Sequence, residues 1–153
     1  MGTYFFDTSA IIKQYFREQG HTWVRNLHEP AQHQLHISQA ALVEVVATIC
    51  RKAREQNITT AKRDALIDTF RQDVQNVYIV RLVNASVYTF AGDLCRSYLL
   101  RAYDAVQLAC ALNLRTETLA NQVAAPTFVC ADNGLINIAL AEGFSIENPN
   151  NYP

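Results

Sequence analysis

Apolar residues along the chain follow two alternating patterns. Short runs rich in aromatic and β-branched residues predict strands at residues 3–6, 35–38, 77–83 and 127–131, with a weaker fifth at 144–146. Between nearly all of these runs, apolar residues recur at spacings of three and four, which predicts amphipathic helices on a core. Strands and helices therefore alternate along the sequence.

Two helices are predicted most clearly. Residues 84–100 carry apolar side chains at helical spacing behind Asn84, which can cap the first turn. Residues 60–74 place apolar side chains on one face and charged side chains on the other, behind a Thr cap. A further helix is expected at residues 135–142, whereas 116–126 is polar and small enough to be a loop, helical at most in part.

Alternating elements with nearly continuous apolar strands favour an α/β fold with a mainly parallel sheet. We expect a three-layer α/β/α sandwich with a central sheet of about four to five strands. Residues 1–147 are expected to form one domain, and 148–153 a short C-terminal tail that frays.

The amino-acid composition indicates how the domain is stabilised and where in the cell it is expected. The 153 residues are 50% hydrophobic, which is enough for one core without disulfide or metal staples, and the net charge of -1 gives no global basic signature. The N-terminus shows no signal-peptide pattern and no long apolar run occurs, so we expect a soluble cytoplasmic protein with no membrane association. Scattered core thiols are expected, rather than a disulfide framework, at Cys50, Cys95, Cys110 and Cys130.

Two acidic residues stand directly after predicted strands. Asp7 follows the apolar run Tyr4-Phe5-Phe6, and Asp132 follows the run at 127–131. In open parallel sheets, ligands bind outside the carboxyl ends of the strands, where side chains from several strands converge. These two carboxylates are therefore expected to lie near one another.

Two more acids lie on predicted helical faces that should be apolar. Glu44 has Ala40, Ala41, Ala47 and Thr48 as its helical neighbours, and Asp104 shares a face with Leu108 and Ala111. A buried carboxylate without a partner would take up a proton, and several together would repel one another. A hard divalent cation reverses that preference. We therefore expect Asp7, Glu44, Asp104 and Asp132 to form one site for Mg²⁺ or Mn²⁺.

The order and flanks of these four acids resemble those of PIN domains, more narrowly VapC-type toxins of bacterial toxin-antitoxin pairs. The resemblance spans almost the whole chain and rests on Phe6-Asp7-Thr8-Ser9-Ala10, Glu44-Val45, Arg101-Ala-Tyr-Asp104-Ala-Val-Gln-Leu-Ala, Phe128-Val-Cys-Ala-Asp132-Asn-Gly-Leu and Ala141-Glu-Gly-Phe144. It implies a metal-dependent endoribonuclease that acts on RNA, is usually a homodimer and is held inactive by a cognate antitoxin protein.

The resemblance also implies roles for individual residues. Asp7 and Asp104 would be the primary metal ligands, and Glu44 and Asp132 would complete the site. Outer positions around the metal are expected for Thr8, Ser9 and Asn133, where Asn133 stands in place of an acidic residue found in some members.

Several of these features also have simpler structural interpretations. Asp7 and Asp132 could each cap a helix, and a basic run at residues 51–54 is more often a solvated helix end than an RNA contact. The spacing of His21, His28, His33 and His36 matches no common zinc site.

Three other functions compete with the ribonuclease. They are a nuclease acting on DNA, a PIN-like binding module without turnover, and a phosphatase or receiver domain. The last is disfavoured because Ser9 stands where a phosphatase needs a second acid.

Overall fold

The computed structural model describes residues 1–29 and 32–153 of the chain and has a single parallel sheet at its centre. The five strands lie in the order β3-β2-β1-β4-β5, and every neighbouring pair is parallel. Their bounds are β1 Gly2–Phe6, β2 His33–Ser38, β3 Tyr78–Arg81, β4 Thr127–Val129 and β5 Ser145–Glu147. The prediction of a mainly parallel sheet of four to five strands is confirmed.

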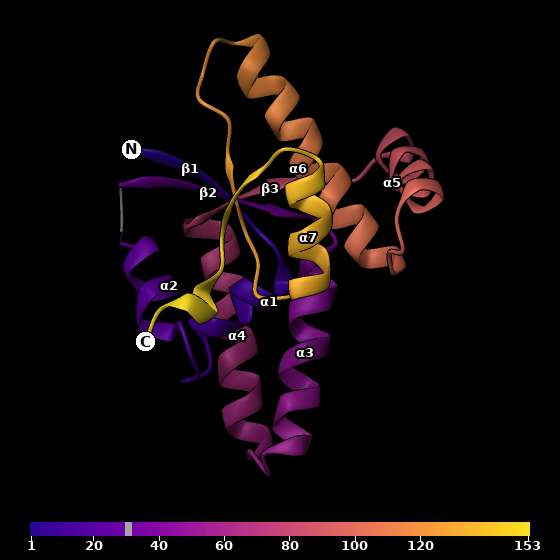
Figure 1. The fold of residues 1–153 in the computed structure, drawn as a ribbon. Helices are drawn as coiled ribbons and strands as arrows, with labels where there is room; N and C mark the ends of the chain where they lie inside the picture. Colours follow the sequence, from indigo (N-terminus) through magenta and orange to yellow (C-terminus); the bar gives the residue numbers. More distant parts are fainter. Residues whose placement is uncertain (30–31) are drawn as a thin grey trace.

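Helices connect these strands and cover both faces of the sheet (Figure 1). They are α1 Thr8–Ile11, α2 His21–Leu27, α3 Ala41–Glu55, α4 Thr60–Asn76, α5 Ala85–Ser97, α6 Ala102–Ala120 and α7 Asn133–Ala141, with 3-10 turns η1 Ile12–Gln14 and η2 Pro149–Asn151. The expected Asn84 cap is present, since its side chain accepts a hydrogen bond from Val87 N at 3.1 Å.

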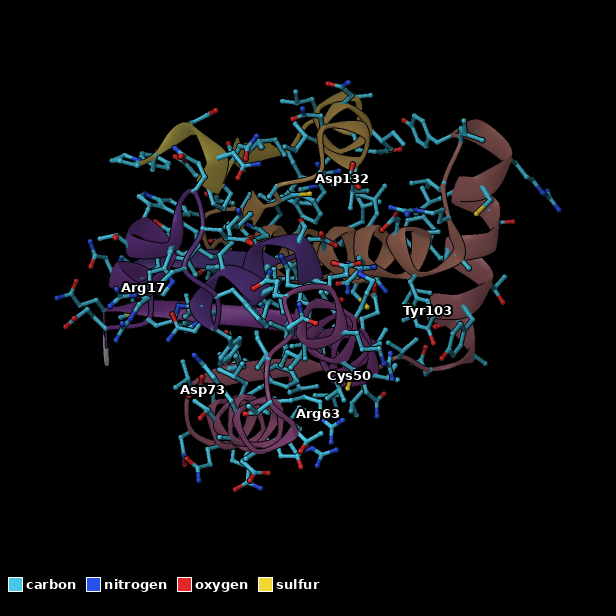
Figure 2. All side chains as sticks on the ribbon, turned by 90° about the horizontal axis from the view of Figure 1, so that it is seen from below. Arg17, Cys50, Arg63, Asp73, Tyr103 and Asp132 are labelled. Atoms are coloured by element: carbon cyan, nitrogen blue, oxygen red, sulfur yellow. The ribbon has the colours of Figure 1, made fainter. Side chains whose placement is uncertain are left out.

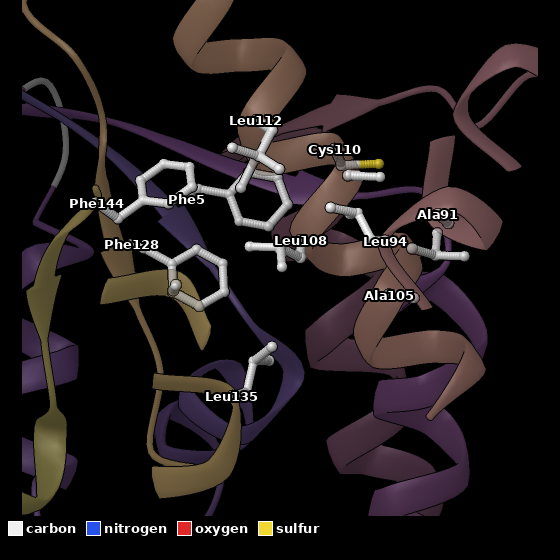
Figure 3. Close-up of a cluster of buried hydrophobic side chains, with 14 of the residues drawn as sticks. Phe5, Ala91, Leu94, Ala105, Leu108, Cys110, Leu112, Phe128, Leu135 and Phe144 are labelled. Carbon is white, nitrogen blue, oxygen red and sulfur yellow. The ribbon is translucent and has the colours of Figure 1, made fainter. Parts of the chain in front are cut away.

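The alternation of side chains along β1 divides the interior into two cores. Phe5 points into a core that α5, α6 and α7 complete, and stacks on Phe128 of β4 with ring centroids 5.9 Å apart (Figure 3). Phe6, the next residue, points to the opposite face, where it packs with residues of α1, α2, α3 and α4. Both faces of the sheet are therefore covered, as the three-layer sandwich requires.

Helices α3 and α4 form a pair that extends beyond the sheet (Figure 1). The buried stripe of α3 recurs at spacings of four and consists of Ala41, Val45, Ile49 and Ala53. This stripe holds α3 on the sheet and leaves its N-terminal turn beside the carboxyl ends of the strands.

The structure bears on two expectations about the second half of the chain. The segment 116–126, expected as a loop that is helical in part, is helical as far as Ala120, where α6 ends. The tail does not fray: residues 149–151 form η2, and the Tyr152 ring stacks on Trp23 with centroids 4.7 Å apart.

The connections of β1 and β4 create the place where a site is expected. From β1 the chain passes to β2 on one side, whereas β4 lies on the other side of β1. Such a reversal leaves an opening at the carboxyl ends of the two strands. Asp7 N donates a hydrogen bond to Val129 O at 2.9 Å, so the residue after β1 is fixed against the end of β4.

Candidate active site

The four acids come together in one pocket at the carboxyl edge of the sheet. A cavity of about 580 Å³ is lined by Asp7, Glu44, Asp104 and Asp132, together with Thr8, Ser9 and four basic residues, Lys13, Arg51, Lys52 and Arg101. The acids come from the end of β1, the first turns of α3 and α6, and the loop after β4. Figure 2 looks at this edge of the molecule and labels Asp132.

Asp7 is the most deeply buried of the four, with 4% of its surface exposed. It caps α1: the carboxylate oxygen Oδ2 accepts hydrogen bonds from Ser9 N at 3.0 Å and Ser9 Oγ at 2.6 Å. Among the described residues, the other oxygen, Oδ1, has no hydrogen-bond partner. Burial raises the pKa of this carboxyl, and the charges of Asp104 and Asp132 raise it further.

Ser9 also joins two strand ends. Its Oγ accepts a hydrogen bond from Ala131 N at 2.9 Å while it donates to Asp7. The hydroxyl therefore connects the residue after β1 to the loop after β4, and it fixes the direction of the Asp7 carboxylate.

Glu44 lies at the margin of the buried stripe of α3 and is half-buried. Its Oε1 accepts a hydrogen bond from Gln107 Nε2 at 2.9 Å, and the same amide nitrogen donates to Thr8 Oγ1 at 3.1 Å. Burial raises the pKa of Glu44, the Gln107 hydrogen bond opposes that rise, and the charges of Asp7 and Asp104 add to it.

Asp104 and Asp132 share one cationic partner. Arg101 Nε lies 3.1 Å from Asp104 Oδ2, and its terminal nitrogen lies 3.3 Å from Asp132 Oδ2. The other oxygen of Asp132, Oδ1, caps α7 by accepting from Leu135 N at 3.2 Å. Capping and pocket lining are therefore compatible, because Asp132 uses a different oxygen for each.

Of the three residues expected around the acids, two line the pocket and one does not. Thr8 and Ser9 line the pocket and hydrogen-bond to groups that hold the acids. Asn133 is exposed as the first residue of α7 and is not among the residues that line the pocket.

Sequence reasoning missed two residues at the site. Gln107 is fully buried, and the signal for it was a polar residue within the apolar run of α6, one turn after Asp104. Cys130 is also buried, with its sulfur 3.7 Å from Asp7 Oδ2 and 3.6 Å from Ser9 Oγ. Burial and the Asp7 charge raise the pKa of this thiol, which keeps it protonated.

The basic residues of the pocket are mostly paired with acids outside the group of four. Lys13 Nζ and Lys52 Nζ lie 3.1 and 2.9 Å from the two oxygens of Glu18. Arg51 Nε lies 3.8 Å from Glu55 Oε1 in an exposed pair. Arg101 is therefore the pocket cation that contacts the acids directly within the part of the chain that the structure describes.

The four acids do not form a closed metal-binding cluster. Within residues 1–29 and 32–153, no three His, Cys, Asp or Glu side chains lie close enough together to hold one ion. Asp104 and Asp132 instead form ion pairs with Arg101. The donor set nevertheless suits a hydrated hard cation, because all four side chains offer oxygen and Mg²⁺ keeps several of its waters.

The histidines are held by hydrogen bonds of their own. His28 Nδ1 donates to Val24 O at 2.8 Å and its Nε2 accepts from Tyr78 at 2.5 Å, while His33 Nδ1 accepts from Gly2 N at 3.1 Å.

No helix in the described ranges combines the length and apolarity needed to cross a bilayer.

Comparison with protein families identifies the class of this chain. The model of the PIN domain matches residues 4–122, and this match covers more than half of the chain. The chain therefore belongs to the PIN-domain family, as the resemblance of its acidic motifs indicated. A comparison with curated proteins gave no significant match.

Solved structures with the same fold include toxin-antitoxin proteins. VapC20 from Mycobacterium tuberculosis, a toxin that cleaves the sarcin-ricin loop, has a TM-score of 0.62 and 16% identity, covering 92% of this chain and 95% of that chain. FitAcB from Neisseria gonorrhoeae has a TM-score of 0.60 and 14% identity, covering 95% of this chain and 96% of that chain.

VapBC2 from Rickettsia felis, bound to a DNA fragment from its promoter, has a TM-score of 0.57 and 14% identity, covering 95% of this chain and 98% of that chain. At these identities the likeness establishes the PIN-like fold.

Proposed function

We propose that this chain is a divalent-metal-dependent endoribonuclease that hydrolyses RNA phosphodiester bonds, and that it is the toxin of a toxin-antitoxin pair. The observation that carries the proposal is the convergence of four carboxylates, from distant parts of the chain, in one pocket of a PIN fold. The raised pKa values of Asp7 and Glu44 support it, because they mark a pocket that gains from added positive charge.

The residues that would hold Mg²⁺ or Mn²⁺ are the same four acids. Asp7 offers Oδ1, which has no protein partner in the described ranges, and Asp104 faces the same pocket. Glu44 and Asp132 complete the set directly or through water. A divalent cation, when bound, supplies positive charge at the phosphate and lowers the pKa of a coordinated water.

The remaining residues orient these ligands and bind substrate. Ser9 holds the Asp7 carboxylate, and Gln107 holds Glu44 against Thr8. The carboxylates repel a phosphodiester, so the basic groups on the pocket wall are needed to attract the RNA backbone. Lys13 and Lys52 lie on that wall, although both are engaged by Glu18.

Partners and location belong to the same proposal. The structural neighbours include a toxin-antitoxin complex from Klebsiella pneumoniae and VapBC2 bound to a promoter fragment, which supports a small antitoxin as partner. We further propose a homodimer, a cytoplasmic location, and a nuclease domain that spans residues 1–147 with 148–153 as its tail.

The proposal is tested by incubating end-labelled RNA and DNA with the purified protein in Mg²⁺, Mn²⁺ or EDTA. We expect cleavage of RNA with either ion, none in EDTA, and none by Asp104→Asn. Asp68→Asn is the matched control, because Asp68 is an exposed carboxylate on α4. Cleavage of DNA alone would support the DNA nuclease, and intact RNA and DNA would support a binding module.

The toxin role needs a separate experiment in cells. We expect induction of the chain to arrest growth, and co-expression of the protein encoded by the neighbouring reading frame to restore it. Normal growth with a catalytically active protein would contradict the toxin role but not the nuclease.

A further inference from the structure

Arg101 holds an unusual position relative to the acidic pocket. It is the residue before α6, in an extended backbone conformation, and its side chain makes no capping hydrogen bond to the helix. Its guanidinium instead lies between Asp104 Oδ2 and Asp132 Oδ2, at 3.1 and 3.3 Å. A single cation is thus shared between an acid on a helix and an acid after a strand.

This arrangement is easily exchanged. The Arg101 side chain is 80% exposed, and ion pairs at such exposure contribute little to stability. Arg101 also borders a second, smaller hollow, which Asp104 and Asp132 line together with Leu99, Leu135 and Ile138, so the guanidinium has open space beside the two acids. The guanidinium can therefore leave the two acids at small cost.

A divalent cation and Arg101 would compete for the same oxygens. The proposed ligands Asp104 and Asp132 both direct Oδ2 toward the guanidinium, so these two oxygens are occupied by a cation of the protein itself. A bound divalent ion carries twice the charge of a guanidinium, so it would displace Arg101 from these oxygens. The displaced guanidinium would remain at the mouth of the pocket, where its planar fork matches a phosphate.

We propose that Arg101 is a substrate-binding residue that occupies the acidic pocket as a counter-ion until a divalent cation displaces it, and then binds the phosphodiester of the RNA. The inference rests on the proposed function and adds to it the group that contacts the phosphate. It also gives the pocket a means to keep its acids paired when no cation is bound.

A purely structural role for Arg101 predicts a different outcome. If the guanidinium only held Asp104 and Asp132 in position, its removal would weaken both cation binding and RNA cleavage. Competition followed by phosphate binding predicts effects of opposite sign, since the removal of a competitor favours the cation while the loss of a phosphate contact disfavours the RNA.

The test compares Arg101→Gln with Arg101→Lys and with Arg96→Gln. Arg96 is a matched control because it is 84% exposed and its Nε lies 3.9 Å from Asp93 Oδ1, three residues away. Mn²⁺ affinity is measured from the electron paramagnetic resonance signal of free Mn²⁺, without RNA. Cleavage of an end-labelled single-stranded RNA gives kcat and KM.

We expect Arg101→Gln to bind Mn²⁺ about two- to tenfold more tightly than the wild type. Its kcat/KM should fall about 10- to 100-fold. The kcat/KM of Arg101→Lys should fall less, because lysine keeps the positive charge but lacks the planar guanidinium. Arg96→Gln should match the wild type in both measurements.

Unchanged or weaker Mn²⁺ binding by Arg101→Gln would overturn the competition. Unchanged kcat/KM would overturn the phosphate contact. Intact RNA with the wild-type protein would overturn the proposed function and the phosphate contact together, whereas the Mn²⁺ titrations would still decide whether Arg101 competes with the cation.

Discussion

Gln107 and Glu44 are joined by a hydrogen bond of 2.9 Å from the Gln107 amide to Glu44 Oε1. The bond connects α6 to α3 across the edge of the acidic pocket. Gln107 is fully buried, and its amide nitrogen also donates to Thr8 Oγ1. One buried amide therefore fixes two residues of the site, and it lowers the pKa of Glu44 against the effect of burial.

Replacement of Gln107 by Leu should lower the stability of the protein. The variant removes both hydrogen bonds and leaves Glu44 in partly buried surroundings, so we expect the free energy of unfolding to fall by about 1–3 kcal/mol. Urea denaturation at pH 7 measures the change. Gln75→Leu, at an exposed position of α4, is the control and should stay within about 0.5 kcal/mol of the wild type.

Asp7→Asn should separate stability from activity. Burial and the neighbouring acids make the ionised carboxylate unfavourable, so a neutral amide should leave the free energy of unfolding at pH 7 unchanged or raise it. RNA cleavage should fall by at least about 10²-fold because a proposed metal ligand is lost. Near-normal RNase activity in a folded Asp7→Asn protein would contradict the role of this carboxylate.

The pH dependence of stability should follow from the same acids. The pKa values of Asp7 and Glu44 lie above their ordinary values of 3.8 and 4.5 in the folded protein, so the folded state binds more protons than the unfolded state. Their contribution is fully present below those ordinary values and is lost as the pH rises through the raised pKa values.

This dependence is measured as a difference between two proteins. The double variant Asp7→Asn/Glu44→Gln lacks both titrations, so its free energy of unfolding should increase relative to the wild type from pH 4 to pH 8. A wild type that gained stability over the variant as the pH rose would show instead that partners stabilise the ionised acids.

Ser9→Ala should loosen the junction between β1 and β4. The variant removes the hydrogen bond of 2.6 Å to Asp7 and the one of 2.9 Å from Ala131 N, and we expect a loss of about 1–2 kcal/mol in the free energy of unfolding. Cleavage should also weaken, since the Asp7 carboxylate loses its orientation. Thermal denaturation beside Ser97→Ala, an exposed position at the end of α5, provides the comparison.

The sheet and most helices could be predicted because the apolar pattern is local and strong. The runs at 3–6 and 127–131 are unbroken, and burial on both faces of a parallel sheet requires that continuity. The end of α6 at Ala120 could not be located from the sequence, because residues 116–120 are mostly exposed and the contact of Glu117 with Arg81, at 2.7 Å, depends on the folded chain.

The sequence predicted the four acids together and Ser9 beside Asp7, whereas it did not predict the contact of Gln107 with Glu44. Asp7 and Asp132 were found because a charge after a core strand is conspicuous, and Glu44 because it interrupts an apolar face. Arg101 and Asp104 are three residues apart, but the contact of Arg101 with Asp132 spans 31 residues of sequence, and only the folded chain determines it. Gln107 was missed for a related reason, since its partners Thr8 and Glu44 are remote in sequence.

The central claim is that the four acids together bind a divalent cation. Crystals of the protein soaked in Mn²⁺ test it most directly, through an anomalous difference map calculated without assuming any site. We expect a peak in the acidic pocket beside Asp7 and Asp104, with Arg101 moved away from the carboxylates it contacts here. A map without a peak in this pocket, at Mn²⁺ concentrations that support cleavage, would contradict the claim.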